Sequence, residues 1–453
     1  MRFHRNLRGC TVPSRRLARL WLGLVLISLV TGSACALFLW SLDRLTRMRW
    51  DNPWLLFLLP LAGVGIGLLY GRLGRRAEGG NNLIIEQIHE PGGGVPARMA
   101  PLVLAGTLVT HLFGGSAGRE GTAVQMGGSI ASLAGRLLRL EPADARMLLM
   151  AGVAAGFGAV FGTPLAGAIF AAEVIAIGRL DYRVLLPCLA ASMLGDIVCA
   201  GWGIDHTHYH IAAVGGTAGG MLDLLLLAKS ALAGIVFGLA GALFAETTHR
   251  MGDLFRRIVP SPLLRPALGG AIIIGLVHLL GTRDYLGLGV TSPDPGAVTI
   301  VSAFTVGGAD PWSWWWKILF TAVTLGSGFK GGEVTPLFFV GACLGNTLAA
   351  LLGAPADLFA GLGFVAVFAG AANTPIACAV MGIELFGGAY ALNIAVACIV
   401  AYLFSGHTGI YLSQRIARPK PPFPSVPAGS SLRSLRALRS AQWGRIFGAS
   451  DGR

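Results

Sequence analysis

Two copies of a Gly-x-Glu-x-Thr motif interrupt otherwise apolar sequence, one in each half of the chain. The first, Gly118–Thr122, carries Glu120, and the second, Gly331–Thr335, carries Glu333, 213 residues later. An ionisable side chain at membrane depth costs free energy, so such a residue usually marks a path for ions or protons. The repeated motif therefore predicts one pathway that is built by two related halves.

A second pair of segments repeats at almost the same distance. A Thr-Pro pair at 163–164 precedes an apolar run that ends at Glu173, and a Thr-Pro pair at 374–375 precedes one that ends at Glu384. The two matched blocks indicate an internal duplication. Helix-breaking residues at matching positions predict a site formed by discontinuous helices. Both Glu173 and Glu384 are expected to be structural and bound by backbone donors at helix ends.

Composition places the chain in a membrane. Hydrophobic residues make up 54% of it and mean hydropathy is +0.67. Charged residues make up 13%, against about 25% in an average soluble domain. Apolar runs of helix-spanning length recur, for example at 20–42, 54–70 and 222–244. The sequence therefore predicts an all-α polytopic membrane protein. Its seven cysteines stand mostly singly in apolar runs, which indicates packing rather than disulfides or metal ligands.

The net charge of +13 is concentrated at the two ends. Positive residues flank the cytoplasmic ends of membrane spans, so both termini are expected to be cytoplasmic and no nucleic-acid partner is needed. The tail is predicted either to be disordered or to form an amphipathic strip near 432–447 at the membrane surface. The predicted segments are a basic N-terminus at 1–19, a first membrane repeat at 20–200, an extracytoplasmic linker at 201–214, a second, inverted repeat at 215–415 and a basic tail at 416–453.

Two polar segments open apolar runs. Gly80-Asn81-Asn82 is expected to be a helix N-terminus, whose unpaired N–H groups, dipole and Asn amides would attract an anion. An ordinary Asn cap is the alternative. Tyr411 is expected at the start of the last apolar helix, either as an interfacial anchor or as a hydroxyl donor to an anion.

Two further clusters have simpler explanations. His206, His208 and His210 alternate in the linker and could bind a metal, but such clusters on exposed loops are usually adventitious, so no metal site is predicted. Four tryptophans beside Lys317 indicate an interfacial belt. They are Trp312, Trp314, Trp315 and Trp316.

The duplicated architecture, with Gly-Arg-Glu-Gly at 118–121 and Pro-Leu-Ala-Gly at 164–167, resembles the CLC family of anion channels and anion/proton antiporters. The resemblance covers roughly residues 20–415. It implies an inverted-repeat fold of many helices, whose halves meet at a midplane anion site. It also implies a homodimer with one pore in each subunit, in a bacterial inner membrane, without a cofactor.

Several motifs depart from those of chloride-handling members. Asn81 and Asn82 stand in place of a Gly-Ser-Gly-Ile-Pro element, and Thr122 replaces the proline after Gly-Arg-Glu-Gly. Gly-Glu-Val-Thr-Pro at 332–336 replaces Gly-x-Phe-x-Pro, and Val174 stands where chloride/proton exchangers have a second glutamate. Together these departures resemble the fluoride-exporting branch of bacterial CLC proteins.

That branch implies a fluoride/proton antiporter. Glu120 is expected to be the gate, which occupies the anion path when deprotonated and carries a proton when protonated. Glu333 is expected to be the inner partner for proton and fluoride. Fluoride is strongly hydrated, so amide donors would replace part of its lost hydration. The residues expected to form the anion path are Gly80, Asn81, Asn82, Gly118, Arg119, Gly121, Thr122, Val334, Thr335 and Tyr411.

Two other functions stay open. A chloride channel or chloride/proton exchanger of the same fold would show strong chloride flux. An intramembrane hydrolase that uses Glu120, Glu333 and the histidine cluster is the remaining alternative, although the sequence has no His-Glu-x-x-His motif.

Overall fold

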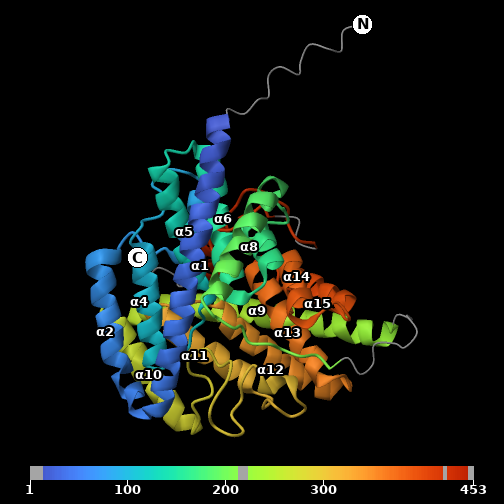
Figure 1. Ribbon diagram of the computed structural model, residues 1–453. Coiled ribbons are helices and arrows are strands. Elements are labelled where there is room, and N and C mark those ends of the chain that lie inside the picture. The colour runs from blue at the N-terminus through green and yellow to red at the C-terminus, as the bar shows by residue number, and fades with distance from the viewer. Residues whose placement is uncertain (1–13, 213–222, 422–425, 447–453) are drawn as a thin grey trace.

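The computed structural model is nearly all helical and describes residues 14–212, 223–421 and 426–446. Helix α1 runs through much of the height of the molecule in Figure 1, and several other helices of the first half pack beside it. The helices of the first half are α1 (Ser14–Asp51), α2 (Leu59–Leu69), α3 (Gly80–His89), α4 (Met99–Leu112), α5 (Glu120–Leu137), α6 (Pro142–Phe161), α7 (Pro164–Glu173) and α8 (Leu185–Gly201).

The second half repeats this series, except that its described residues contain no α-helix at the place of α3, and it ends in a short tail helix. Its elements are α9 (Leu224–Ile258), α10 (Leu264–Leu280), α11 (Ser313–Ser327), α12 (Val334–Leu352), α13 (Ala356–Ala372), α14 (Pro375–Phe386), α15 (Ala391–Phe404) and α16 (Leu432–Ile446). Two strands of two residues, β1 (Ala176–Ile177) and β2 (Arg415–Ile416), pair in parallel. Shorter helical turns are η1 (Pro53–Leu58), η2 (Tyr70–Gly74), η3 (Tyr182–Val184) and η4 (Ser302–Phe304).

The prediction of an all-α polytopic membrane protein is confirmed. Six helical stretches in the described part of the chain are long and apolar enough to cross a membrane, and shorter apolar helices of 10–17 residues accompany them. The predicted boundary at residue 215 lies outside the described residues. Helix α9 begins at Leu224, where the Asp223 side chain accepts a hydrogen bond from the Leu226 N–H at 2.9 Å.

The two halves break their helices in the same way. Gly162 closes α6 and Asn373 closes α13, both in the left-handed region with φ of 69° and 59°. Glycine and asparagine are the residues that tolerate this conformation at a helix end. Thr163 and Thr374 follow with φ of −128° and −129°, and a proline then starts the next helix. The repeated Thr-Pro motif is therefore a helix break that occurs twice.

Two buried or half-buried glutamates join the halves by capping each other's helices. Glu173, at the end of α7, accepts hydrogen bonds from the N–H groups of Ile376 (3.1 Å) and Ala377 (2.8 Å) at the start of α14. Glu384 on α14 accepts in return from Leu165 and Ala166 at the start of α7, at 2.9 and 2.8 Å. The prediction that both glutamates are bound by helix-terminal donors is confirmed. A carboxylate at a helix N-terminus is also stabilised by the helix dipole.

We expect Glu173→Ala to destabilise the protein by about 2–4 kcal/mol, because two charge-assisted hydrogen bonds are lost and two N–H groups remain buried. Glu173→Gln should lose roughly half as much, because an amide offers only one oxygen. Chemical unfolding in detergent measures the difference. Glu78→Ala, in the exposed turn before α3, is the control. Equal stability of the Glu173→Ala and control variants would contradict a capping role.

The expectation that Tyr411 opens an apolar helix is wrong. Helix α15 ends at Phe404, and the chain from 405 to 414 has no helix. Gly406 has a positive φ of 60°, and Gly409 lies so close to Asn373 that an added Cβ would be 2.7 Å from its Nδ2 atom. The backbone then pairs with β1 as strand β2, so its hydrogen bonds go to the first half rather than to a helix.

The tail contains a helix that docks on the protein. Leu432 and Leu435 of α16 are buried against the two short strands. Arg436 forms an ion pair with Asp253 of α9, with 2.7 Å between Nη2 and Oδ2. The disordered alternative is therefore wrong for 432–446, and the predicted amphipathic helix packs on the protein itself through its first turns.

Lys317 does not belong to an interfacial belt. Trp312 and Trp315 are exposed, as a belt requires, but the Lys317 side chain is fully buried. Its Nζ donates to the carbonyl oxygens of Tyr285 (3.1 Å) and Gly287 (2.8 Å). Lys317 directly follows the last tryptophan on α11 but lies on the face that packs into the molecule, and its ammonium group stabilises the loop before η4.

Candidate functional site

The two Gly-x-Glu-x-Thr motifs meet in space. The Gly118 N–H donates to the Gly332 carbonyl at 2.6 Å, and the Gly332 N–H donates to the Gly118 carbonyl at 2.7 Å, which forms an isolated antiparallel bridge. An added Cβ on Gly332 would lie 2.8 Å from the backbone nitrogen of Gly121, so only glycine permits this approach. The matching segments of the two halves therefore run in opposite directions where they meet.

Glu120 is the buried acceptor at this junction. The residue is 1% exposed. The Thr335 hydroxyl donates to the carboxylate, at 2.6 Å from Oε1 and 2.7 Å from Oε2, and the Thr335 N–H donates to Oε2 at 3.1 Å. The Arg119 N–H also donates to Oε2 at 3.1 Å. The carboxylate of the first motif is therefore bound mainly by the second motif, 215 residues away in sequence.

The start of α12 supplies the donors for this carboxylate. The first N–H groups of a helix have no partner within the helix. Pro336 has no N–H, and the Leu337 N–H donates to the Glu333 carbonyl at 3.2 Å. The N–H groups of Val334 and Thr335 remain as helix-start donors, and Thr335 uses its own for Glu120. Two amides and a hydroxyl at a positive dipole end make a site suited to a small anion.

Glu333 lies at the N-cap position of α12, directly before these donors. Its side chain is partly buried and makes no capping hydrogen bond with the helix. Tyr411 is buried and lies within electrostatic range of both Glu120 and Glu333. Its ring packs edge-on against Phe170, with 6.4 Å between centroids. The structure therefore brings both glutamates and Tyr411 together, although Tyr411 arrives on a loop.

The two asparagines at the start of α3 have different neighbours and different roles. Helix α3 begins at Gly80, which has a positive φ of 53°. Asn81 faces the junction, because an added Cβ on Gly121 would lie 3.1 Å from its Nδ2 atom. Its Oδ1 atom is buried and without a hydrogen-bond partner among the described residues. Asn82 accepts a hydrogen bond from the Ser413 N–H at 2.9 Å, so its amide oxygen positions the segment after Tyr411.

The other predicted residues of the first motif lie around Glu120 in different roles. The Arg119 Nε atom is 3.5 Å from Oε1 of Glu120. The Thr122 hydroxyl shares a hydrogen bond of 2.7 Å with the Thr107 hydroxyl on α4, so it connects α5 to its neighbour. Thr107 was not predicted, and no spacing in the sequence points to it.

The linker also approaches the site, which sequence patterns did not predict. Tyr209 lies within electrostatic range of Arg119 and Glu120, and its ring packs on Phe364 with 5.2 Å between centroids. His206 packs on Gly162. Burial and the neighbouring Arg119 lower the pKa of His206 to about 4, which keeps this ring neutral at pH 7. Among the described residues, no three His, Cys, Asp or Glu side chains converge on a metal-ion position.

One segment bears on the hydrolase alternative. Residues Gly114–Gly118 have the Gly-x-Ser-x-Gly spacing of serine hydrolases, with Ser116 at the centre. Ser116 is fully buried, and its hydroxyl is paired with that of Thr321 at 3.0 Å. A nucleophile elbow needs an exposed serine on a strand-to-helix turn. The segment instead connects α4 to α5 through the bridge at Gly118.

Comparison with known proteins agrees with this architecture. A family model described as voltage gated chloride channel matches residues 62–406. A chloride/fluoride channel protein of Pseudomonas syringae pv. tomato is 51% identical over 407 residues, which cover 88% of this chain and 87% of the relative. An H(+)/Cl(−) exchange transporter of Yersinia pestis is 28% identical over 329 residues, which cover 69% of this chain and 66% of the relative.

Solved structures share the fold. The crystal structure of a CLC-type fluoride/proton antiporter matches with a TM-score of 0.83 and 34% identity, covering 90% of this chain and 100% of that one. A slow cyanobacterial Cl(−)/H(+) antiporter matches with a TM-score of 0.72 and 19% identity, covering 96% and 99%. The second likeness concerns the fold alone.

Proposed function

Because the chain belongs to the voltage-gated chloride channel (CLC) family, we propose that it is a fluoride/proton antiporter that exports fluoride in exchange for protons. The observation that carries the proposal is the Glu120 carboxylate bound by the hydroxyl and N–H of Thr335. The relative that is 51% identical is named for chloride and fluoride, and the structure at 34% identity is a fluoride/proton antiporter.

In this proposal the Glu120 carboxylate occupies the position that the transported anion takes. A deprotonated carboxylate is attracted by the Thr335 donors at the positive end of α12. Protonation removes that charge, so the side chain can leave and fluoride can replace it. Fluoride is a strong hydrogen-bond acceptor, and charge-assisted bonds from a hydroxyl and amides offset its dehydration. Each time the protonated side chain turns to the outer side and back, it carries one proton in the direction opposite to the anion.

Glu333 is proposed as the inner proton acceptor. It precedes the same donors, and Tyr411 lies within electrostatic range of both glutamates. Val174 offers no carboxylate where chloride/proton exchangers have one, so the proton needs another route. Asn81 and Tyr411 would line the central part of the anion path, since both lie beside the junction.

The surroundings of the transporter are part of the same proposal. We expect a homodimer in a bacterial inner membrane, with both termini cytoplasmic. Exposed Leu186 and Ile197 on α8 and Ile399 on α15 provide apolar faces for lipid or for a second subunit. A mass measurement of the purified protein in detergent tests the dimer, for which two chains per particle are expected.

The experiment that tests the function is efflux from proteoliposomes loaded with fluoride or with chloride, with the internal pH recorded. Fluoride should leave much faster than chloride, and its gradient should drive protons in the opposite direction. Chloride efflux as fast as fluoride efflux would favour the alternative, a chloride channel or chloride/proton exchanger of the same fold.

Gly118→Ala should slow fluoride efflux about tenfold. The added methyl group crowds the pathway, and a steric cost of ~1.4 kcal/mol corresponds to a tenfold lower rate. The added Cβ would lie 2.9 Å from Oε2 of Glu120 and 3.0 Å from the Thr335 nitrogen, so the carboxylate and its donors must separate. Gly65→Ala on α2, where an added Cβ meets nothing within 4 Å, is the control. Equal rates in both variants would contradict the placement of the anion path beside Gly118.

A further inference from the structure

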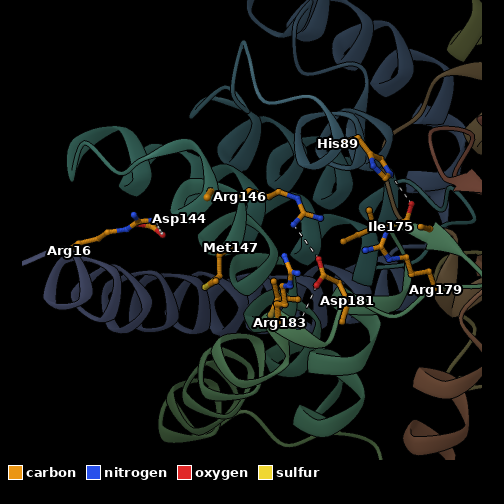
Figure 2. Close-up of a pocket in the computed structure, with 13 residues that line it drawn as sticks. Arg16, His89, Asp144, Arg146, Met147, Ile175, Arg179, Asp181 and Arg183 are labelled. Atoms are coloured by element: carbon orange, nitrogen blue, oxygen red, sulfur yellow. Dashed lines mark hydrogen bonds and ion pairs between the residues drawn. The ribbon is translucent and has the colours of Figure 1, made fainter. Parts of the chain in front are cut away.

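A cavity of about 490 Å³ lies away from the glutamate junction, where the start of α1 meets the turn before α8. Four arginines, two aspartates and one histidine line it together with small and apolar side chains. Figure 2 shows Arg146, Arg179 and Arg183 around Asp181, with Arg16 and Asp144 at the other end. We call this cavity the arginine pocket. Its charged residues are Arg16, Asp144, Arg146, Arg179, Asp181 and Arg183.

Both aspartates in the arginine pocket are already neutralised. Arg16 donates two hydrogen bonds to Asp144, at 2.7 and 2.9 Å. Arg146 donates to Asp181 at 3.2 Å and to the Ile88 carbonyl at 2.9 Å, which fixes the plane of its guanidinium group. The pocket therefore contains two ion pairs, and its remaining charge comes from other residues.

Arg179 and Arg183 supply that remaining charge. Both are exposed, and neither forms an ion pair with a carboxylate among the described residues. The Asp181 side chain instead accepts from the Arg183 backbone N–H at 3.3 Å, which sets the turn that carries this arginine. An adjoining cavity shares Arg179 and Arg183 and adds Arg418 from the tail. Guanidinium groups that converge without a counter-ion are suited to a phosphate group, which they bind through two parallel hydrogen bonds.

The walls of the arginine pocket indicate how the phosphate is presented. Val184 and Ile175 line it with apolar surface. Tyr182 and Leu186, beside Arg183 at the start of α8, are 74% and 67% exposed. An exposed tyrosine and leucine beside arginines at the end of an apolar helix are typical of the interface between membrane and water. A ligand there would have an anionic head and an apolar body.

We propose that the arginine pocket binds the phosphate group of an anionic phospholipid. Arg179 and Arg183 contact the phosphate oxygens, Arg146 is positioned beside them by Asp181, and the acyl chains lie along the exposed apolar start of α8. This site is separate from the transport pathway, so the proposal does not depend on which anion the protein carries.

The test is native mass spectrometry of the full-length protein, titrated with phosphatidylglycerol and, separately, with phosphatidylcholine. The wild type should retain phosphatidylglycerol more tightly. An arginine in direct contact with the phosphate of an anionic lipid contributes about fivefold in affinity, so Arg179→Gln/Arg183→Gln should bind it about 25-fold more weakly. The matched control is Arg75→Gln/Arg76→Gln, two exposed arginines in the turn after η2 that do not line the arginine pocket, which should change affinity less than twofold.

The remaining arms decide between the sources of phosphate. Calorimetric titration with inorganic phosphate should give no saturable binding at millimolar concentration if the lipid is the ligand. Saturable binding of inorganic phosphate that the double variant loses, without retention of phosphatidylglycerol, would overturn the lipid source. Equal retention of phosphatidylglycerol by the double variant and the wild type would overturn the site. Because both arginines are exposed, an unchanged melting temperature is expected and excludes misfolding as the cause.

Discussion

Glu120→Gln is expected to abolish the proton movement that a fluoride gradient drives. The rate of proton movement should fall to that of protein-free liposomes. Glutamine cannot take up or release a proton. It also lacks the charge by which the Thr335 donors retain the side chain at the start of α12, so fluoride should still pass without coupling. The measurement is fluoride efflux and internal pH in the same proteoliposomes.

Glu78→Gln is the matched control, because it makes the same chemical change in an exposed turn. It should transport and couple like the wild type. If Glu120→Gln still moved protons with fluoride, Glu120 would not be the gate, and the proton-carrying group would have to be sought at Glu333.

Glu333→Gln should reduce coupled fluoride export by about 100-fold, since a positioned acid or base typically contributes at least that factor to proton transfer. The substitution keeps the size of the side chain and removes its ability to accept a proton. Glu120 remains bound by Thr335, so it should still close the anion path. It should no longer receive protons from the inner side. Efflux with the pH recorded measures both effects.

The two variants distinguish the roles of the glutamates. Loss of the gate leaves uncoupled fluoride flux in Glu120→Gln, whereas loss of the inner acceptor in Glu333→Gln leaves little flux of either kind. Wild-type coupling in Glu333→Gln would contradict the inner role and would require a proton path that avoids α12. Glu78→Gln again serves as the control.

Much of the fold could be predicted, because its main signals are periodic. The apolar runs, the duplicated Thr-Pro breaks and the repeated glutamate motif all lie in continuous sequence. The binding of Glu173 and Glu384 by helix-terminal donors was predicted from their matched positions, but the structure alone shows that each caps a helix of the other half. The helix expected at Tyr411 did not form, because a short segment with two glycines has few helical hydrogen bonds to gain and its backbone pairs with β1 instead.

The candidate site was predicted as a set of residues but not as an arrangement. Glu120, Glu333 and Thr335 were identified from the motif, and the structure brings them together. Asn81 and Asn82 looked equivalent in sequence, yet only Asn81 faces the junction, because Asn82 is engaged by Ser413. Side chains one position apart on a helix point in different directions, so their neighbours differ.

By itself the sequence determined that this chain spans a membrane, that its two halves are duplicates, and that each half presents a glutamate at a helix start. These properties follow from composition and local spacing, which do not depend on where a segment lies in the folded protein. Only the tertiary structure decided that Thr335 binds Glu120, that Lys317 is buried against loop carbonyls and that Arg179 and Arg183 line one cavity. Such contacts depend on how distant segments pack, and packing is a property of the whole chain rather than of any pattern within it.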